Sequence, residues 1–226
     1  MSRRRKPHLR CASCRMHRSL CICALLPRLA TRTRVVVIIH QLEVSKPTNT
    51  GLLAARCLDN ASVVYRGRGP DEAPGADLRE IVSAGTRSLV LFPHPEARPL
   101  EAWRGSAEDI QLIVPDGTWS QAARTRRRLE VLAGLPCVTL PARAGRNDRL
   151  RAAPRPGRLA TLEAVAVALG VLEGPAVEEA LMRVYRTMTE RTLWTNGRIR
   201  TEEVTGGIPA GVRPHDPLGR DGPRDY

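Results

Sequence analysis

Apolar residues recur along the chain in short runs separated by polar, Gly- and Pro-rich segments. The run at 34–39 is continuously apolar after its first residue, which favours a buried strand of a parallel sheet. Strands are predicted at 34–39, 62–65, 88–92, 110–114 and 137–140, and helices at 52–58, 77–84, 100–103, 120–132, from within 157–163 to about 173, and 176–193. Five strands alternating with helices predict an α/β fold with a mostly parallel sheet flanked by helices.

The turn that follows the fourth predicted strand combines several local signals. A proline stops the strand, Gly117 permits a tight turn, and Thr118 followed three residues later by Gln121 has the form of a helix capping box. The chain should therefore pass from strand to turn to helix, with Asp116 and Trp119 at the carboxyl end of the strand. Ligands of open α/β sheets bind at this end of the strands.

The composition adds a strong positive charge to this picture. The 226 residues carry 36 Lys and Arg against 23 Asp and Glu, which gives a net charge of +13. Such a surface attracts polyanions, and nucleic acid is the first candidate, although non-specific binding needs no more than this. Residues 1–10 form a basic arm without a following signal-peptide core, and no apolar run approaches the roughly 20 residues of a membrane span. We therefore expect a cytoplasmic protein with no membrane partner.

Four cysteines lie within thirteen residues near the N-terminus: Cys11, Cys14, Cys21 and Cys23. In a reducing cytoplasm a metal explains this cluster better than disulfides do, and four thiolates suit a tetrahedral, structural Zn²⁺ ion. The second pair is spaced more tightly than usual, His17 is a competing ligand, and a redox-active or merely reduced cluster is the alternative. A closed site would hold residues 11–33, which cannot build a core of their own.

Basic and polar residues gather near the predicted strand ends and helix starts. The loop at 43–51 offers Lys46 and Asn49 to phosphate or ribose, or uses its Pro, Asn, Thr and Gly only for turns and caps. The helix at 120–132 carries a basic face that suits an RNA backbone or a solvated surface, and the irregular segment after it is also rich in arginine. The arginines predicted to bind RNA are Arg124, Arg127, Arg128, Arg149, Arg151, Arg155 and Arg158.

Several stretches resemble the DTW-domain family. Asp116-Gly117-Thr118-Trp119 is similar to its Asp-x-Thr-Trp signature, and its C-x-x-C…C-x-C, Lys-Pro-x-Asn-Thr-Gly and Leu-Phe-Pro stretches recur at 11–23, 46–51 and 91–93. Residues 151–163 resemble its Arg-x-x-Pro-x-x-Gly-x-Leu-Ala-Thr-x-Glu hallmark, and the likeness covers most of 11–190. The resemblance implies a SPOUT-like fold, of a kind that can be knotted, with a DTW domain at 34–200. It also implies transfer of the aminocarboxypropyl group of S-adenosylmethionine (SAM) to a tRNA uridine.

The resemblance further implies roles for individual residues. Asp116 would act as a base towards uridine N3 or orient the uracil edge. Trp119 would stack on uracil or adenine, or lie near the sulfonium, and Thr118 would either bond to the substrate or only cap its helix. An arginine of 149–158 would bind the transferred carboxylate. The SAM site would comprise two strand ends and the start of a helix with Thr161 as its N-cap and Glu163 in its first turn: Leu91, Phe92, Pro93, Val114, Pro115, Asp116, Leu159, Ala160 and Thr161.

Two other functions fit parts of the sequence. A SPOUT-type SAM-dependent RNA methyltransferase would use the same pocket with the methyl carbon in line, and a non-catalytic, zinc-containing RNA-binding protein would need only the cysteines and the charge. No Gly-x-Gly-x-x-Gly follows the first strand, so an ordinary dinucleotide site is not supported. The tail at 201–226 is rich in Gly, Pro and charge and is predicted to be disordered, and a monomer is expected.

Overall fold

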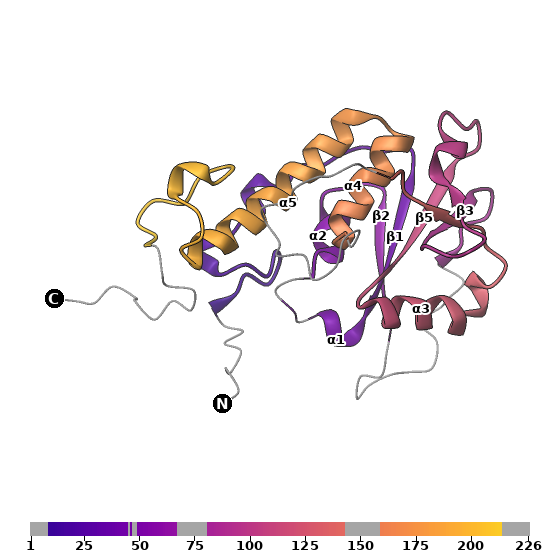
Figure 1. Cartoon of the computed structure of the whole chain (residues 1–226), viewed down its shortest axis with the longest axis horizontal. Helices are drawn as coiled ribbons and strands as arrows, with labels where there is room; N and C mark the ends of the chain where they lie inside the picture. Colours follow the sequence, from indigo (N-terminus) through magenta and orange to yellow (C-terminus); the bar gives the residue numbers. More distant parts are fainter. Residues whose placement is uncertain (1–8, 45, 47–48, 67–80, 143–158, 214–226) are drawn as a thin grey trace.

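The computed structural model describes residues 9–44, 46, 49–66, 81–142 and 159–213. Within these ranges six strands form one sheet in the order β2-β1-β5-β3-β6-β4, and every pairing is parallel (Figure 1). The strands are β1 Arg34–His40, β2 Ala61–Arg66, β3 Arg87–Leu91, β4 Arg98–Pro99, β5 Ile110–Asp116 and β6 Cys137–Thr139. The predicted α/β class with a mostly parallel sheet is confirmed.

All five predicted strands are present, with ends displaced by at most two residues. The sequence did not predict β4, because its two residues include a proline and no apolar run, and only the pairing with β6 makes it a strand. β5 lies between β1 and β3 and pairs with both, so the strand that ends in Asp116 is central.

Helices cover both faces of the sheet: α1 Gln41–Val44, α2 Gly51–Arg56, α3 Trp119–Arg128, α4 Thr161–Leu172 and α5 Pro175–Thr195. Alternate side chains of the central strands enter two separate cores. Val35 and Leu112 pack with residues of α2, α4 and α5, whereas Val36 and Ile113 pack on the other face with Leu129, which follows α3. Because both faces are buried, β1 reads as a continuous apolar run.

The helices differ from the predictions in their ends and their type. α3 stops at Arg128 instead of 132, because buried Leu129 has an extended backbone and a separate 3₁₀ turn, Glu130–Leu132, follows it. The segment at 100–103 is also a 3₁₀ turn, and α1 was not predicted. Residues 77–80 lie outside the described residues, and 81–84 are not α-helical. None of the helices that the structure describes combines the length and apolarity needed to cross a membrane.

The C-terminal half of α5 extends beyond the sheet, and both ends of the described chain gather around it (Figure 1). Residues 9–25, with the 3₁₀ turns Arg18–Leu20 and Cys23–Leu25, bury Leu20 and Ile22 in the same core as α5. Residues 201–213 form the 3₁₀ turn Thr201–Glu203 and bury Val204 in that core. The prediction of a disordered tail is therefore wrong for 201–213, because its few apolar residues are anchored. Residues 214–226 lie outside the described residues.

Candidate active site

The residues of the Asp116 turn lie at the carboxyl edge of the sheet. In Figure 1, β1 and β5 run downward, and α1 and α3, which directly follow them, lie at their lower ends. Asp116 is the last residue of β5 and is in register with Ile39 of β1. Ligands of parallel α/β sheets bind at this edge, so Asp116 occupies the kind of position that the sequence predicted.

Local signals build the turn between β5 and α3. Gly117 has φ +133°, a conformation that L side chains rarely adopt, and a Cβ there would lie 2.8 Å from Gln121 Oε1. The backbone N–H of Thr118 donates to Gln121 Oε1 (2.6 Å), and the backbone N–H of Gln121 donates to Thr118 Oγ1 (3.3 Å). The capping box is therefore present, and the Thr118 hydroxyl acts as a helix cap.

The Asp116 carboxylate is buried, with only 6% of the residue exposed, and both of its oxygens accept hydrogen bonds. Asn49 Nδ2 donates to Oδ2 (2.7 Å), and the Thr161 hydroxyl donates to Oδ1. Burial raises the pKa of Asp116 above its ordinary value of 3.8, and the charge of Glu43 acts in the same direction. These two hydrogen bonds and one from the Gly117 backbone oppose the shift, because they stabilise the charged carboxylate.

The starts of α2 and α4 meet at this carboxylate. Asn49 Oδ1 accepts a backbone N–H of the first turn of α2 (3.0 Å), so the same side chain caps α2 and binds Asp116. Thr50 Oγ1 accepts the backbone N–H of Leu162 in α4 (3.3 Å). Gly51 permits the close approach, since a Cβ at this position would lie 2.9 Å from Asp116 Cγ.

Thr161 is the first helical residue of α4 and not its N-cap, which corrects the sequence prediction. Ala160 occupies the N-cap position, and its backbone N–H donates to Glu163 Oε2 (2.7 Å). Glu163 therefore serves the helix start as expected, while the Thr161 hydroxyl is directed to Asp116. The general preference for threonine as a cap is overruled here because a buried carboxylate requires hydrogen-bond donors.

An exposed aromatic side chain follows Asp116 three residues later in the chain. Trp119, the first residue of α3, is 41% exposed, and its ring lies at 53° to that of Phe92 with centroids 6.1 Å apart. Phe92 directly follows β3, the neighbour of β5. Leu159, two residues before α4, is 46% exposed. The exposed ring of Trp119 provides a surface on which a flat base can stack.

The other residues predicted to bind SAM lie at this edge at different depths. Val114 and Ala160 are buried, Leu91 and Pro115 are half-buried, and Pro93 is exposed. They belong to the ends of β3 and β5 and to the start of α4, three segments that are distant in the sequence. The tertiary structure brings these segments together through the sheet pairing of β3 with β5 and the hydrogen bond between α4 and β5.

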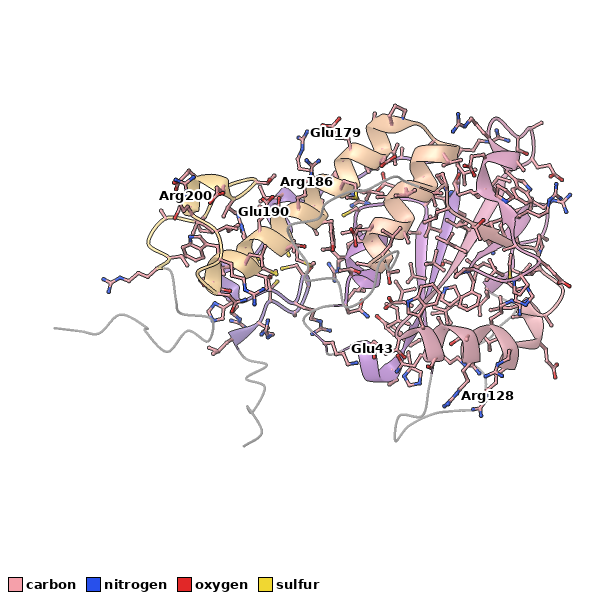
Figure 2. All side chains as sticks on the ribbon, viewed as in Figure 1. Glu43, Arg128, Glu179, Arg186, Glu190 and Arg200 are labelled. Carbon is pink, nitrogen blue, oxygen red and sulfur yellow. The ribbon has the colours of Figure 1, made fainter. Side chains whose placement is uncertain are left out.

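Three arginines of α3 line a surface hollow of about 380 Å³: Arg124, Arg127 and Arg128. All three are exposed, and none has a carboxylate partner among the described residues. Figure 2 shows Arg128 at the end of α3, pointing away from the sheet. Five other surface arginines of the described residues do form ion pairs with carboxylates: Arg28–Asp59, Arg32–Asp109, Arg87–Glu108, Arg183–Glu179 and Arg200–Glu203.

The remaining residues predicted to bind RNA divide into two groups. Asn49 is 8% exposed with both polar atoms of its amide engaged, and Lys46 forms an ion pair with Glu43. These contacts organise the loop, as the turn-and-cap alternative requires, and an RNA contact by either residue stays a prediction. The second group lies outside the described residues: Arg149, Arg151, Arg155 and Arg158.

The four N-terminal cysteines form a second site beside the C-terminal half of α5. The Sγ atoms of Cys11 and Cys23 lie 3.6 Å apart, those of Cys14 and Cys21 lie 3.7 Å apart, and all four lie within 4.8 Å of one another. Four thiolates at about 2.3 Å from Zn²⁺ would be separated by about 3.8 Å. The cluster therefore fits a tetrahedral ion, and His17 does not belong to the group of neighbouring ligand atoms.

The DTW domain matches residues 8–193, which is most of the chain and includes both sites. The chain belongs to the DTW-domain family. One curated relative of this DTW chain, tRNA-uridine aminocarboxypropyltransferase 2 of Drosophila melanogaster, is 32% identical over 195 residues, which cover 84% of this chain and 77% of the relative. The Macaca fascicularis and Mus musculus proteins of the same name are each 30% identical, over 87% and 84% of this chain and 67% and 65% of those relatives. No solved structure matches the chain significantly.

A buried arginine connects the cysteine cluster of this DTW chain to its C-terminal segment. Arg191, on α5, is only 3% exposed, and its Nη1 donates to the carbonyls of Leu20 (3.2 Å) and Cys21 (2.9 Å). Its other nitrogens donate to the carbonyls of Gly206 (3.3 Å) and Gly207 (3.1 Å). This residue was not predicted from the sequence, although an arginine on the apolar face of a helix was a usable signal.

Several groups that surround Asp116 were also not predicted from the sequence. Glu43 of α1, and Thr50 and Gly51 at the start of α2, all lie in the stretch that follows β1, which the sequence linked to RNA and not to the motif. The sequence offered only one indication of their role, namely that they follow a predicted strand. That strand, β1, becomes the neighbour of β5 only in the folded sheet.

Proposed function

We propose that this chain transfers the 3-amino-3-carboxypropyl group of SAM to N3 of a uridine in tRNA and releases methylthioadenosine. The observation that carries the proposal is the name shared by its relatives, tRNA-uridine aminocarboxypropyltransferase 2, at 30–32% identity over 84–87% of the chain. The meeting of the DTW motif with the starts of α2 and α4 at the ligand-binding edge of the sheet supports it.

In the proposed reaction, uridine N3 forms a bond to the carbon that joins the aminocarboxypropyl group to sulfur. The carbon–sulfur bond breaks, its electron pair neutralises the sulfonium, and N3 releases its proton to solvent water. Three electrophilic carbons surround that sulfur, so the product depends on which of them lies in line with N3. The main task of the protein is therefore to orient two substrates.

The edge around Asp116 fits the adenosine part of SAM. Phe92 and Leu159 supply apolar surface, and the backbone around Pro93 and Ala160 supplies fixed polar groups. Sites for small ligands combine mostly apolar walls with a few convergent polar groups in this way. We place SAM between the ends of β3 and β5 and the start of α4.

Trp119 is our candidate for stacking on the target uracil. The adenine of SAM is the alternative base on which its ring could stack. Trp119 is 41% exposed and lies three residues after the buried acid, and stacking on an aromatic side chain contributes about 1–3 kcal/mol per base. Thr118 is engaged as the cap of α3, so a bond to substrate would compete with the helix. The role of Asp116 as a base stays a prediction, and a buried carboxylate with two hydrogen-bonded oxygens suits it poorly.

The tRNA backbone would pass along α3. This helix carries three exposed arginines without carboxylate partners among the described residues, and its first residue is Trp119. Lys and Arg that neutralise phosphates supply most of the sequence-independent affinity for nucleic acid. A uridine stacked on Trp119 would therefore have its neighbouring phosphates close to Arg124, Arg127 and Arg128.

The cysteine cluster would hold a structural Zn²⁺ ion that takes no part in the reaction. Four thiolates leave no open coordination position, which is the arrangement of structural and not catalytic zinc. A reducing compartment keeps such thiols free to bind metal, and we propose the cytoplasm. The ion would fix residues 11–25 against α5.

The deciding experiment is a reaction of purified protein with SAM and unmodified tRNA, followed by digestion to nucleosides and mass spectrometry. Aminocarboxypropyluridine and an equal amount of methylthioadenosine are expected. Trp119→Ala should lower the rate strongly, whereas the matched variant Trp119→Phe keeps a ring and should retain most of it. A methylated uridine would instead identify a methyltransferase, and tRNA binding without SAM binding or product would identify a non-catalytic RNA-binding protein.

A further inference from the structure

We infer that Asp116 is a positioning residue, whose carboxylate fastens the starts of α2 and α4 to the end of β5, and that it does not take the proton from uridine. This inference rests on the proposed function and changes the role of the residue at the centre of its motif. It also assigns a role to Asn49, Gly51 and Thr161 as the groups that hold Asp116 in place.

The hydrogen bonds of the carboxylate leave little room for a substrate proton. Oδ1 accepts the Thr161 hydroxyl, Oδ2 accepts the Asn49 amide, and the Gly117 backbone N–H provides a third donor. A carboxylate has about four acceptor positions in all. A general base must also come within about 2.6–3.2 Å of the proton that it removes.

Gly51 closes the remaining approach to the same oxygen. A Cβ on Gly51 would lie 2.9 Å from Asp116 Cγ and 3.0 Å from its Oδ2, so the α2 backbone covers that side of the carboxylate. Only 6% of Asp116 is exposed, while Trp119, three residues later, is 41% exposed. The side chain that faces a substrate in this motif is therefore the tryptophan and not the acid.

The segments joined by Asp116 are those that would carry both substrates. β5 leads through Gly117 into α3 and Trp119, while α4 begins with Ala160 and Thr161. A second bond, from the Leu162 backbone N–H to Thr50 Oγ1 (3.3 Å), ties α2 directly to α4. Losing the carboxylate would release all three segments relative to one another, and errors of about 1 Å in substrate placement can cost about 10²-fold in rate.

Asparagine at position 116 separates positioning from proton transfer. Its carbonyl can still accept from Asn49, and its amide can donate to the Thr161 hydroxyl, which then acts as the acceptor. Asp116→Asn should therefore keep kcat/KM within about tenfold of the wild type, because the hydrogen bonds with Asn49 and Thr161 survive. Removing a general base costs about 10²–10⁴-fold instead.

The test compares Asp116→Asn, Asp116→Ala, Thr161→Val and the control Thr161→Ser, which keeps the hydroxyl. Two readouts are measured: kcat/KM against pH, and hydrogen exchange at the starts of α2 and α4. We expect Asp116→Asn and Thr161→Ser to resemble the wild type in hydrogen exchange and in kcat/KM, including any fall in kcat/KM towards acid pH. Asp116→Ala and Thr161→Val should speed exchange at α4 and raise the KM for SAM.

Two results would overturn the inference. One is an Asp116→Asn enzyme that keeps native hydrogen exchange but has a kcat lowered at least about 10²-fold and no longer shows the fall in kcat/KM towards acid pH. The other is an Asp116→Ala protein whose helix starts exchange as slowly as those of the wild type. The second readout needs no catalysis, so an inactive wild type would reject the proposed function while exchange still decides the positioning role.

Discussion

At the scale of single residues, the surroundings of Asp116 show how a buried carboxylate is tolerated. Taking a charge out of water is costly unless hydrogen bonds or other charges offset the loss, and here Asn49, Thr161 and the Gly117 backbone supply them. The fit around this group is tight because glycine stands where any side chain would touch it.

Gly51→Ala is expected to destabilise the protein and to impair catalysis. The added methyl would lie 2.9 Å from Asp116 Cγ and 3.0 Å from Val37 Cγ1, so the carboxylate or the helix must shift. Overpacking of this kind lowers the free energy of unfolding by about 1–3 kcal/mol. Displacement of the hydrogen bonds around Asp116 should reduce kcat/KM at least about tenfold. Gly134→Ala is the matched control, because a Cβ there meets nothing within 4 Å. Equal unfolding midpoints and rates for the two variants would contradict the prediction.

Asp116→Asn is expected to be more stable than the wild type at neutral pH. The pKa of Asp116 is raised in the folded state, so the contribution of this group to stability is lost as the pH rises from 3.8 through the folded pKa. Asparagine removes that penalty. Urea unfolding at pH 7.5, 6 and 5 should show a gain that is largest at pH 7.5 and shrinks towards acid pH. A gain that is independent of pH, or a loss at pH 7.5, would contradict this account.

At the scale of single elements, α3 combines a local start with a basic surface. The capping box at Thr118 defines its first residue, and Ala122 and Thr125 face the protein. The exposed side carries arginines and no acidic residue. Cations near the C-terminus of a helix also interact well with its dipole, which explains part of the pattern without RNA.

Replacing Arg124, Arg127 and Arg128 together by Gln is expected to weaken tRNA binding and flatten its salt dependence. Each phosphate contact contributes about −0.7 to −0.9 to the slope of log K against log salt, so the slope should fall by about 2–3. The control replaces three exposed, ion-paired arginines and changes the net charge equally: Arg28, Arg87 and Arg183. Filter binding across salt concentrations measures both, and equal losses would show that only total charge matters.

At the scale of the whole molecule, the two ends of the described chain meet on α5, away from the sheet (Figure 1). Arg191 donates to carbonyls of the cysteine segment and of residues 206–207, while the Thr205 backbone N–H donates to Glu190 (2.6 Å). The cysteine cluster and the C-terminal segment are therefore parts of one assembly.

Removal of the metal is expected to loosen this assembly without dissolving the sheet. One Zn²⁺ per chain should be found by elemental analysis, and a strong chelator should lower Tm by at least about 5 °C, since each kcal/mol is worth about 2–4 °C at this size. Cys21→Ser should lose the ion, whereas Cys57→Ala, a buried cysteine outside the cluster, should keep it. Full metal content in Cys21→Ser would reject the four-thiol site.

Truncation after residue 200 is expected to destabilise the protein more than truncation after residue 213. The longer deletion exposes the surface that buries Val204 and leaves the Arg191 guanidinium without two of its acceptor carbonyls. An unsatisfied buried donor costs about 1–3 kcal/mol. Thermal unfolding and the rate of zinc loss to a chelator should both distinguish the two proteins, and identical values would mean that 201–213 contributes nothing.

The sequence by itself determined the features that depend on neighbouring residues. Five strands, the capping box at Thr118, the glycine of the turn and the four clustered cysteines could all be predicted, because periodicity, caps and ligand spacing act within about a dozen residues. The position of Asp116 at the end of a strand followed from the same signals. These local patterns also carried the likeness to the DTW family, which the match over 8–193 confirms.

Only the tertiary structure decided how Asp116 is used. Asn49 and Thr161 lie 67 and 45 residues away from it in the chain, and their contact exists because β5 inserts beside β1 and α4 packs across that edge. No local preference reports such a pairing, and the general preference for Thr161 as a cap even indicated a different role. The same holds for Arg191 and Val204, since burial at the far end of α5 depends on segments that meet only after folding.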